Sequence, residues 1–132
     1  MNAVTFPMLL AIAAGGAAGS VTRYLISMWM MRASGAFPVA TLTVNIVGAF
    51  LLGFLARALN TPDTNPVLRA ALTIGFCGGF TTFSTFSAEF VMLVQEGRSG
   101  RAVAYALVSV ITGVLAVVAG MALGDRILSA RS

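Results

Sequence analysis

The sequence predicts an all-α membrane protein with four transmembrane helices, which form a single domain over residues 1–132. The composition supports this prediction, because 58% of the residues are hydrophobic, only 9% are charged, and neither Lys nor His occurs. A soluble domain could not cover its surface with so few charges. Four charge-free runs of about 20 residues each have the length that crosses a hydrocarbon core of about 30 Å. These runs are residues 1–22, 33–56, 70–88 and 102–124.

The first run could be mistaken for a signal peptide, because its Ala-rich sequence at residues 11–13 resembles a cleavage site. No Lys or Arg precedes its apolar stretch, so the basic start of a signal peptide is missing. We therefore interpret residues 1–22 as the first transmembrane helix.

Loops at residues 35–38, 60–66 and 96–101 contain Gly, Pro or Asn, which interrupt helices. Consecutive helices are therefore expected to be antiparallel neighbours.

Polar side chains recur on one face of three of the predicted helices. Residues three, four or seven positions apart lie on the same side of a helix. Together the three faces predict one lined pathway. The alternative is that the hydroxyls bond carbonyls of their own helices and that the Asn only links helices. The polar residues are Thr41 and Asn45 on the second helix, Thr82, Thr85 and Glu89 beside Phe86 on the third, and Tyr105, Ser109 and Thr112 on the fourth.

The third span contains the segment 75–86, which places a glycine pair and four hydroxyls at mid-membrane depth. We predict that this helix is broken at Gly78-Gly79. In hydrocarbon, a broken helix persists only where protein, water or an ion satisfies the freed backbone groups. The break therefore marks a conduction or binding site, and freed carbonyls suit a hard cation. The alternative is a simple kink that neighbouring hydroxyls solvate.

Arginines near the membrane ends normally accumulate on the cytoplasmic side. Here they are balanced at four against four, which gives the insertion machinery no preference. The balance predicts dual topology, in which both orientations are made and pair as an antiparallel homodimer. The alternative is that the balance is accidental and another signal sets the orientation. One side carries Arg57, Arg69, Arg126 and Arg131, and the other carries Arg23, Arg32, Arg98 and Arg101.

Close contacts between helices are expected at three pairs of glycines spaced four apart, since small residues let helix backbones approach. The pairs are Gly15 with Gly19, Gly75 with Gly79, and Gly120 with Gly124. Four helices are also too few to enclose a polar path easily, which independently favours an oligomer.

The predicted pathway suits a small, strongly hydrated anion. Hydroxyls and the Asn amide donate hydrogen bonds, and a phenyl ring has a positive edge. Glu89 is the one feature of the pathway that argues against an anion. The chain has no His, no nucleotide-binding pattern and no paired carboxylates, so we do not expect an enzyme or a nucleic-acid partner.

Three segments of the chain form recognisable motifs: residues 15–24 (GGAAGSVTRY), 41–53 (TLTVNIVGAFLLG) and 75–86 (GFCGGFTTFSTF). They resemble the Fluc or CrcB family of small bacterial fluoride channels. Ser20, where the family more often has Ala, is a minor departure. The resemblance implies a multi-pass protein of the bacterial inner membrane, an antiparallel dual-topology homodimer with two pores. Its partners would be the lipid bilayer and fluoride, which each pore passes passively while rejecting chloride.

The resemblance also implies roles for individual residues. Phe83 and Phe86 match the two pore phenylalanines, Asn45 matches the pore-lining asparagine, and Tyr105 matches the tyrosine of the fourth helix. Gly78 and Thr81 match the positions whose backbone carbonyls hold a central, structural sodium ion. Candidates for a polar track along the pore are Thr82, Ser84, Thr85, Ser109 and Thr112.

Two other functions compete with this interpretation. A small dual-topology multidrug and proton antiporter would be equally compact, but it would need a buried carboxylate in the first helix, which has none. A structural or assembly subunit of a larger membrane complex would need no pathway, so the predicted break and the polar faces disfavour it.

Overall fold

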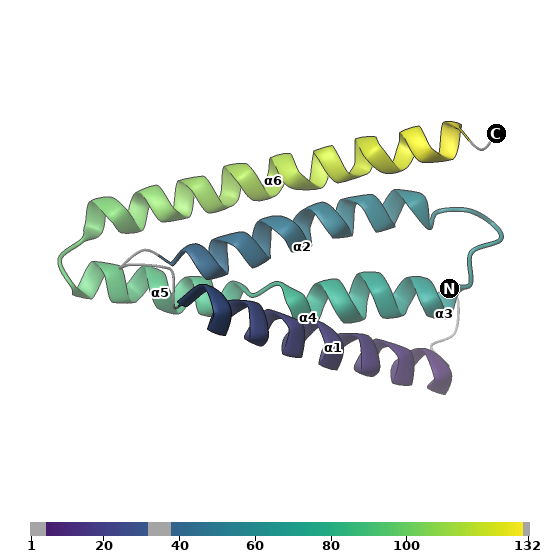
Figure 1. The fold of residues 1–132 in the computed structure, drawn as a ribbon, viewed down its shortest axis with the longest axis horizontal. Coiled ribbons are helices and arrows are strands. Elements are labelled where there is room, and N and C mark those ends of the chain that lie inside the picture. The colour runs from purple at the N-terminus through teal and green to yellow at the C-terminus, as the bar shows by residue number, and fades with distance from the viewer. Residues whose placement is uncertain (1–4, 32–37, 131–132) are drawn as a thin grey trace.

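The computed structural model describes residues 5–31 and 38–130, and these residues form helices and no strand. Four segments are long and apolar enough to cross a membrane. They run up, down, up and down, so the start of α1 and the end of α6 lie at the same end of the bundle (Figure 1). The helices are α1 (Phe6–Met31), α2 (Val39–Ala58), a third span composed of α3 (Pro66–Ala70), η1 (Ala71–Cys77), α4 (Gly78–Phe80) and α5 (Phe83–Gln95), and α6 (Ser99–Ser129).

The four predicted spans are confirmed, but each helical segment extends beyond its charge-free run. α1 continues past Arg23, α2 continues past Arg57 to Ala58, and the third span and α6 are longer than their runs at both ends. A charged residue ends an apolar run in the sequence. It does not end a helix when its side chain finds a partner or reaches the membrane surface. The predicted loop at residues 35–38 falls mostly outside the described residues.

The third span departs from a regular α-helix in two places. Residues Ala71–Cys77 form a π-helix, η1, which the sequence did not reveal. After α4, the backbone is extended at Thr81 (φ −81°, ψ 157°) and at Thr82 (φ −148°, ψ 115°) before α5 begins. The prediction of a break at Gly78-Gly79 is therefore wrong in position, because both glycines are helical. Threonine suits the extended segment, since its β-branched side chain favours extended backbone.

α2 is the central helix, since it packs against α1, α6, η1, α4 and α5. Its most extensive contact is with α6, which lies alongside it (Figure 1). There Gly53 and Gly120 bring the two backbones together. A Cβ at Gly53 would overlap the Val117 carbonyl, and a Cβ at Gly120 would overlap the Phe50 carbonyl.

α1 packs against η1 and α4 in the same way. A Cβ at Gly19 would overlap the carbonyl of Phe76, and a Cβ at Gly79 would overlap the carbonyl of Gly16. The glycine pairs singled out in the sequence thus lie at contacts between helices. Backbones this close gain van der Waals contact, which drives helix association where lipid removes the hydrophobic effect.

The position of Arg23 changes the arginine balance. The sequence places Arg23 near the end of the first helix, but α1 continues for eight residues beyond it to Met31, which is about 12 Å of helix. The guanidinium therefore belongs to the interior of the span and not to a loop. Without Arg23 the count is four against three, and two of these arginines, Arg32 and Arg131, lie outside the described residues.

We predict that Gly19→Leu destabilises the chain by about 2 kcal/mol or more, because the added side chain must separate α1 from η1. Unfolding of the purified protein by SDS, followed by helical circular dichroism, measures the loss. Gly113→Leu on α6 is the matched control, since a Cβ there meets nothing within 4 Å. Equal destabilisation by the two substitutions would contradict the close packing of α1.

Candidate functional site

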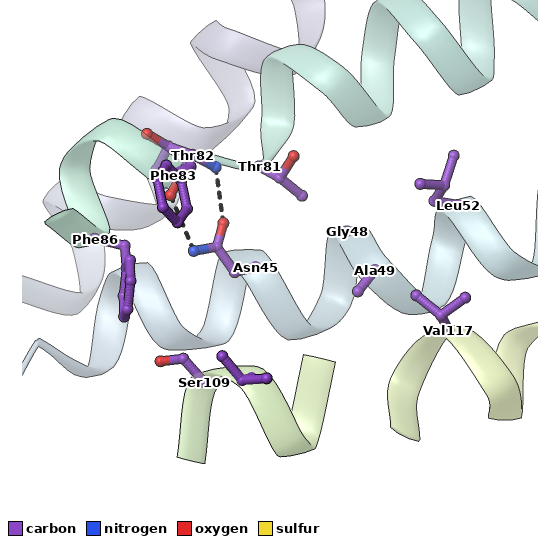
Figure 2. Close-up of a pocket in the computed structure, with 11 residues that line it drawn as sticks. Asn45, Gly48, Ala49, Leu52, Thr81, Thr82, Phe83, Phe86, Ser109 and Val117 are labelled. Atoms are coloured by element: carbon purple, nitrogen blue, oxygen red, sulfur yellow. Dashed lines mark hydrogen bonds between the residues drawn. The ribbon is translucent and has the colours of Figure 1, made fainter. Parts of the chain in front are cut away.

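An open groove lies among α2, the extended part of the third span and α6. Its volume is about 340 Å³. Figure 2 shows Asn45 of α2 between the extended segment and α6, with Ser109 on the α6 side. A mostly apolar lining with a few convergent polar groups is typical of ligand sites. The lining residues are Asn45, Gly48, Ala49, Leu52, Thr81, Thr82, Phe83, Phe86, Ser109, Val110 and Val117.

Asn45 pairs with the backbone of Thr82 (Figure 2). Its Oδ1 accepts a hydrogen bond from the Thr82 N–H at 2.7 Å, and its Nδ2 donates to the Thr82 carbonyl at 3.1 Å. Because the backbone is extended here, the N–H and C=O of Thr82 form no helical hydrogen bonds, and in hydrocarbon each of them needs another partner. Asn45 therefore does link helices, as the alternative interpretation held. Its Nδ2 carries a second hydrogen that this pairing does not use.

The hydroxyls predicted from the third helix gather at the start of α5. Thr82 caps this helix, because its Oγ1 accepts a hydrogen bond from the Thr85 N–H at 3.2 Å. The same hydroxyl donates to Thr85 Oγ1 at 3.0 Å and lies 3.2 Å from Ser84 Oγ. Of these three residues only Thr82 lines the groove. The polar-track roles of Ser84 and Thr85 stay predictions.

Two phenyl rings line the groove from α5. The ring centroids of Phe83 and Phe86 are 5.7 Å apart, and the rings are tilted by 38°. Phe83 is 79% exposed, whereas Phe86 packs against the fully buried Tyr105 at 5.0 Å and 52°. Phe86 is therefore held in place by α6, while Phe83 presents an uncovered ring.

Ser109 is the most informative polar residue of the groove. Its Oγ is buried and has no hydrogen-bond partner among the described residues. A buried polar group left unpaired costs about 1–3 kcal/mol, and such a group in a native structure is a marker of a bound water or ion. Thr112, predicted on the same face, bonds the carbonyl of Val108 in its own helix at 2.6 Å and does not line the groove. Its polar-track role stays a prediction.

A closed polar cluster lies one helical turn from the groove residues. Glu89 of α5 accepts hydrogen bonds from Thr41 Oγ1 and from the Tyr105 hydroxyl, both at 2.7 Å and each at a different carboxylate oxygen. Thr41 and Tyr105 are buried, and each is four residues from a groove residue on its own helix, Asn45 and Ser109. The sequence placed Glu89 on the polar face but did not identify these partners. None of the three lines the groove, so the carboxylate is not one of its surfaces.

Some backbone carbonyls around α4 accept hydrogen bonds and others do not. The Cys77 carbonyl accepts hydrogen bonds from the Thr81 N–H at 3.0 Å and from Thr81 Oγ1 at 2.9 Å. The Gly79 carbonyl accepts hydrogen bonds from Ser20 and Arg23 of α1. The carbonyls of Gly78 and Thr81 accept no hydrogen bond from any residue that the structure describes. These two are the carbonyls that the family resemblance assigns to a sodium ion.

The fold and the groove define a multi-pass helical membrane protein with a mostly apolar groove that contains a few polar groups among its spans. Residues 10–121 match the model of the family described as "CrcB-like protein, Camphor Resistance (CrcB)", and the chain belongs to this family.

Three relatives share most of their length with this chain. One from Agrobacterium fabrum (strain C58) is 48% identical over 121 residues, 88% of this chain and 94% of the relative. One from Rhizobium meliloti (strain 1021) is 45% identical over 117 residues, 87% of this chain and 94% of the relative. One from Escherichia coli (strain K12) is 45% identical over 124 residues, 93% of this chain and 94% of the relative. All three are named fluoride-specific ion channel FluC, so the relatives are channels and not enzymes.

We predict that Asn45→Leu destabilises the chain by about 2 kcal/mol or more, because it leaves both backbone groups of Thr82 unpaired. SDS unfolding of the purified protein measures the loss. Ser87→Ala is the control, since the Ser87 hydroxyl bonds the Phe83 carbonyl of its own helix and is exposed. A loss at Asn45 no larger than that at Ser87 would contradict the pairing.

Proposed function

We propose that this chain is a fluoride-specific ion channel, as its relatives are named, and that it acts in the bacterial inner membrane. The observation that carries the proposal is the buried Ser109 hydroxyl, which has no partner among the described residues and lines the groove. The same groove is lined by Asn45, whose Nδ2 has a second hydrogen, and by the rings of Phe83 and Phe86. These neutral groups offer their positive ends to a ligand. None of the lining residues is charged, so a small anion that has lost its water finds replacement donors.

A passive pore is sufficient for export. Hydrofluoric acid enters a cell as the neutral molecule and dissociates at cytoplasmic pH, which traps fluoride inside. An inside-negative membrane potential then drives the anion out, at about 2.3 kcal/mol per charge per 100 mV. The chain therefore needs donors along a path and no energy source.

We further propose that two copies pair in antiparallel orientation and that the dimer has two pores. Two features support a partner copy. The groove is open along one side rather than enclosed. The Phe83 ring is 79% exposed in the single chain, although the resemblance assigns it to the pore. A second chain that covers this face would close the groove and bury the ring.

We also propose a structural sodium ion at the dimer centre, held by the carbonyls of Gly78 and Thr81 from both copies. The residues fit such an ion, because these carbonyls accept no hydrogen bond from the described residues and Gly78 is exposed with open space around it. Hard cations prefer oxygen ligands, and unwound helical segments in membranes supply them. A bound cation satisfies carbonyls that lipid cannot.

We predict that the purified protein in liposomes releases fluoride under a potassium–valinomycin potential and excludes chloride. Phe83→Ile and Phe86→Ile should each slow fluoride release by about tenfold, because an aliphatic side chain fills the space without a positive edge. A fluoride electrode measures release. Phe6→Ile is the matched control, since Phe6 is similarly exposed at 71% but lies at the start of α1.

The same experiment separates the competing functions. Wild-type protein that releases no fluoride would contradict the channel. Release that requires a proton gradient would contradict a passive channel and favour a fluoride–proton antiporter, with Glu89 of α5 as the membrane-embedded carboxylate. If both Phe→Ile variants release fluoride at the wild-type rate, Phe83 and Phe86 only pack against neighbouring residues and do not contact the ion.

We predict that two or three Lys residues added at residues 60–64 fix one orientation and that the same addition at residues 96–98 fixes the other. Each variant alone should fail to protect cells from fluoride, because an antiparallel dimer needs both orientations, and co-expression should restore protection. Gln at the same positions is the control. Protection by either Lys variant alone would contradict the antiparallel dimer.

A further inference from the structure

Arg23 is the only charged residue of α1, and it lies inside the span. An arginine at this depth is costly unless a partner satisfies it. Its partner is a backbone oxygen: Arg23 Nε donates a hydrogen bond to the Gly79 carbonyl at 3.1 Å, and the contact is partly buried. The arginine therefore satisfies a backbone carbonyl of the third span.

Ser20 reaches the same oxygen from one turn earlier on α1. Its Oγ donates to the Gly79 carbonyl at 3.3 Å. A carbonyl oxygen has two lone pairs, and these two donors occupy both. The approach is possible because Gly79 lies against Gly16, where a Cβ would overlap the Gly16 carbonyl. Gly16, Ser20 and Arg23 are spaced four and three apart, so they share one face of α1.

The two donors replace a hydrogen bond that the third span has lost. In a continuous α-helix the Gly79 carbonyl would accept from the N–H of Phe83, four residues on. The extended residues Thr81 and Thr82 separate these groups. The guanidinium also lies at the carbonyl end of η1 and α4, where a positive charge is favourable.

We propose that Arg23 and Ser20 are positioning residues that form a two-donor clamp, holding the Gly79 carbonyl against α1 and so orienting the carbonyls of Gly78 and Thr81. The part of this inference that concerns sodium rests on the ion site proposed above. The peptide plane before Gly79 carries the Gly78 carbonyl, and the Thr81 carbonyl lies two peptide planes beyond that of Gly79, so fixing the Gly79 carbonyl limits the directions of both proposed ligands. Without the clamp the carbonyls sample several directions, and their affinity for a cation falls.

Hydrogen–deuterium exchange of the full-length protein tests the clamp without reference to any ion. Arg23→Gln should speed exchange of the amides of residues 80–83 on the order of tenfold, because it removes a charge-assisted hydrogen bond. Ser20→Ala should do so by a smaller factor, and Arg23→Lys should retain part of the protection. Thr22→Ala is the matched control, since the Thr22 hydroxyl bonds the Ala18 carbonyl of its own helix at 2.8 Å.

The sodium dependence of fluoride release separates positioning from a general structural role. Sodium is replaced by N-methyl-D-glucamine throughout purification and reconstitution and is then added back. Arg23→Gln should raise the sodium concentration for half-maximal release on the order of tenfold while the maximal rate stays near that of the wild type. Thr22→Ala should leave both quantities unchanged.

Two results would overturn the inference. One is wild-type exchange at residues 80–83 in both Arg23→Gln and Ser20→Ala. The other is faster exchange throughout the molecule with an unchanged sodium midpoint, which would make Arg23 an ordinary stabilising residue. If Arg23→Gln does not fold, the exchange rate of the amides of residues 80–83 in Ser20→Ala tests the clamp by itself. Wild-type protein that releases no fluoride would contradict the proposed channel function. Fluoride release that does not depend on sodium would contradict the proposed sodium site. In both cases the hydrogen–deuterium exchange measurement still tests whether Arg23 and Ser20 hold the Gly79 carbonyl.

Discussion

The structure depends on the requirement that backbone groups inside a membrane find partners within the protein. Thr81 and Thr82 lie in the third span with extended backbone, so they leave the hydrogen-bond pattern of a helix. Lipid offers no replacement. Asn45 supplies both partners for Thr82, and the Thr81 N–H and hydroxyl return to Cys77. The extended segment is therefore stable inside the membrane only because other residues of the chain form hydrogen bonds with its backbone.

This requirement also accounts for the packing of the helices. A side chain can reach the interrupted segment only if the helix that carries it lies close by. Gly79 lies against Gly16, and Gly48 of α2 lies against the Thr81 side chain, with no room for a Cβ at either glycine. The glycine contacts of α1 and α2 thus bring donors such as Asn45 within hydrogen-bond distance of the third span.

The polar side chains between the spans fall into two sets with different chemistry. Glu89 accepts hydrogen bonds from the hydroxyls of Thr41 and Tyr105 in a closed cluster and does not line the groove. The groove itself retains a donor, Ser109, that the described residues leave unpaired. The carboxylate that argued against an anion in the sequence is compatible with one in the groove because it faces Thr41 and Tyr105 and does not line the groove.

The sequence by itself determined the number and order of the spans and the family, because apolar run length and the motif at residues 75–86 are local properties. It also singled out Asn45, Phe83, Phe86 and Ser109, which line one groove. Only the tertiary structure decided that the backbone extends at Thr81 and Thr82, and which partners satisfy Arg23 and Glu89. The hydrogen bonds of Arg23 and Glu89 join residues 16, 48 and 56 positions apart, and those of Asn45 with Thr82 and of Ser20 with Gly79 join residues 37 and 59 positions apart. No periodic pattern encodes such pairs, since they form only when the packing of the spans brings the groups together.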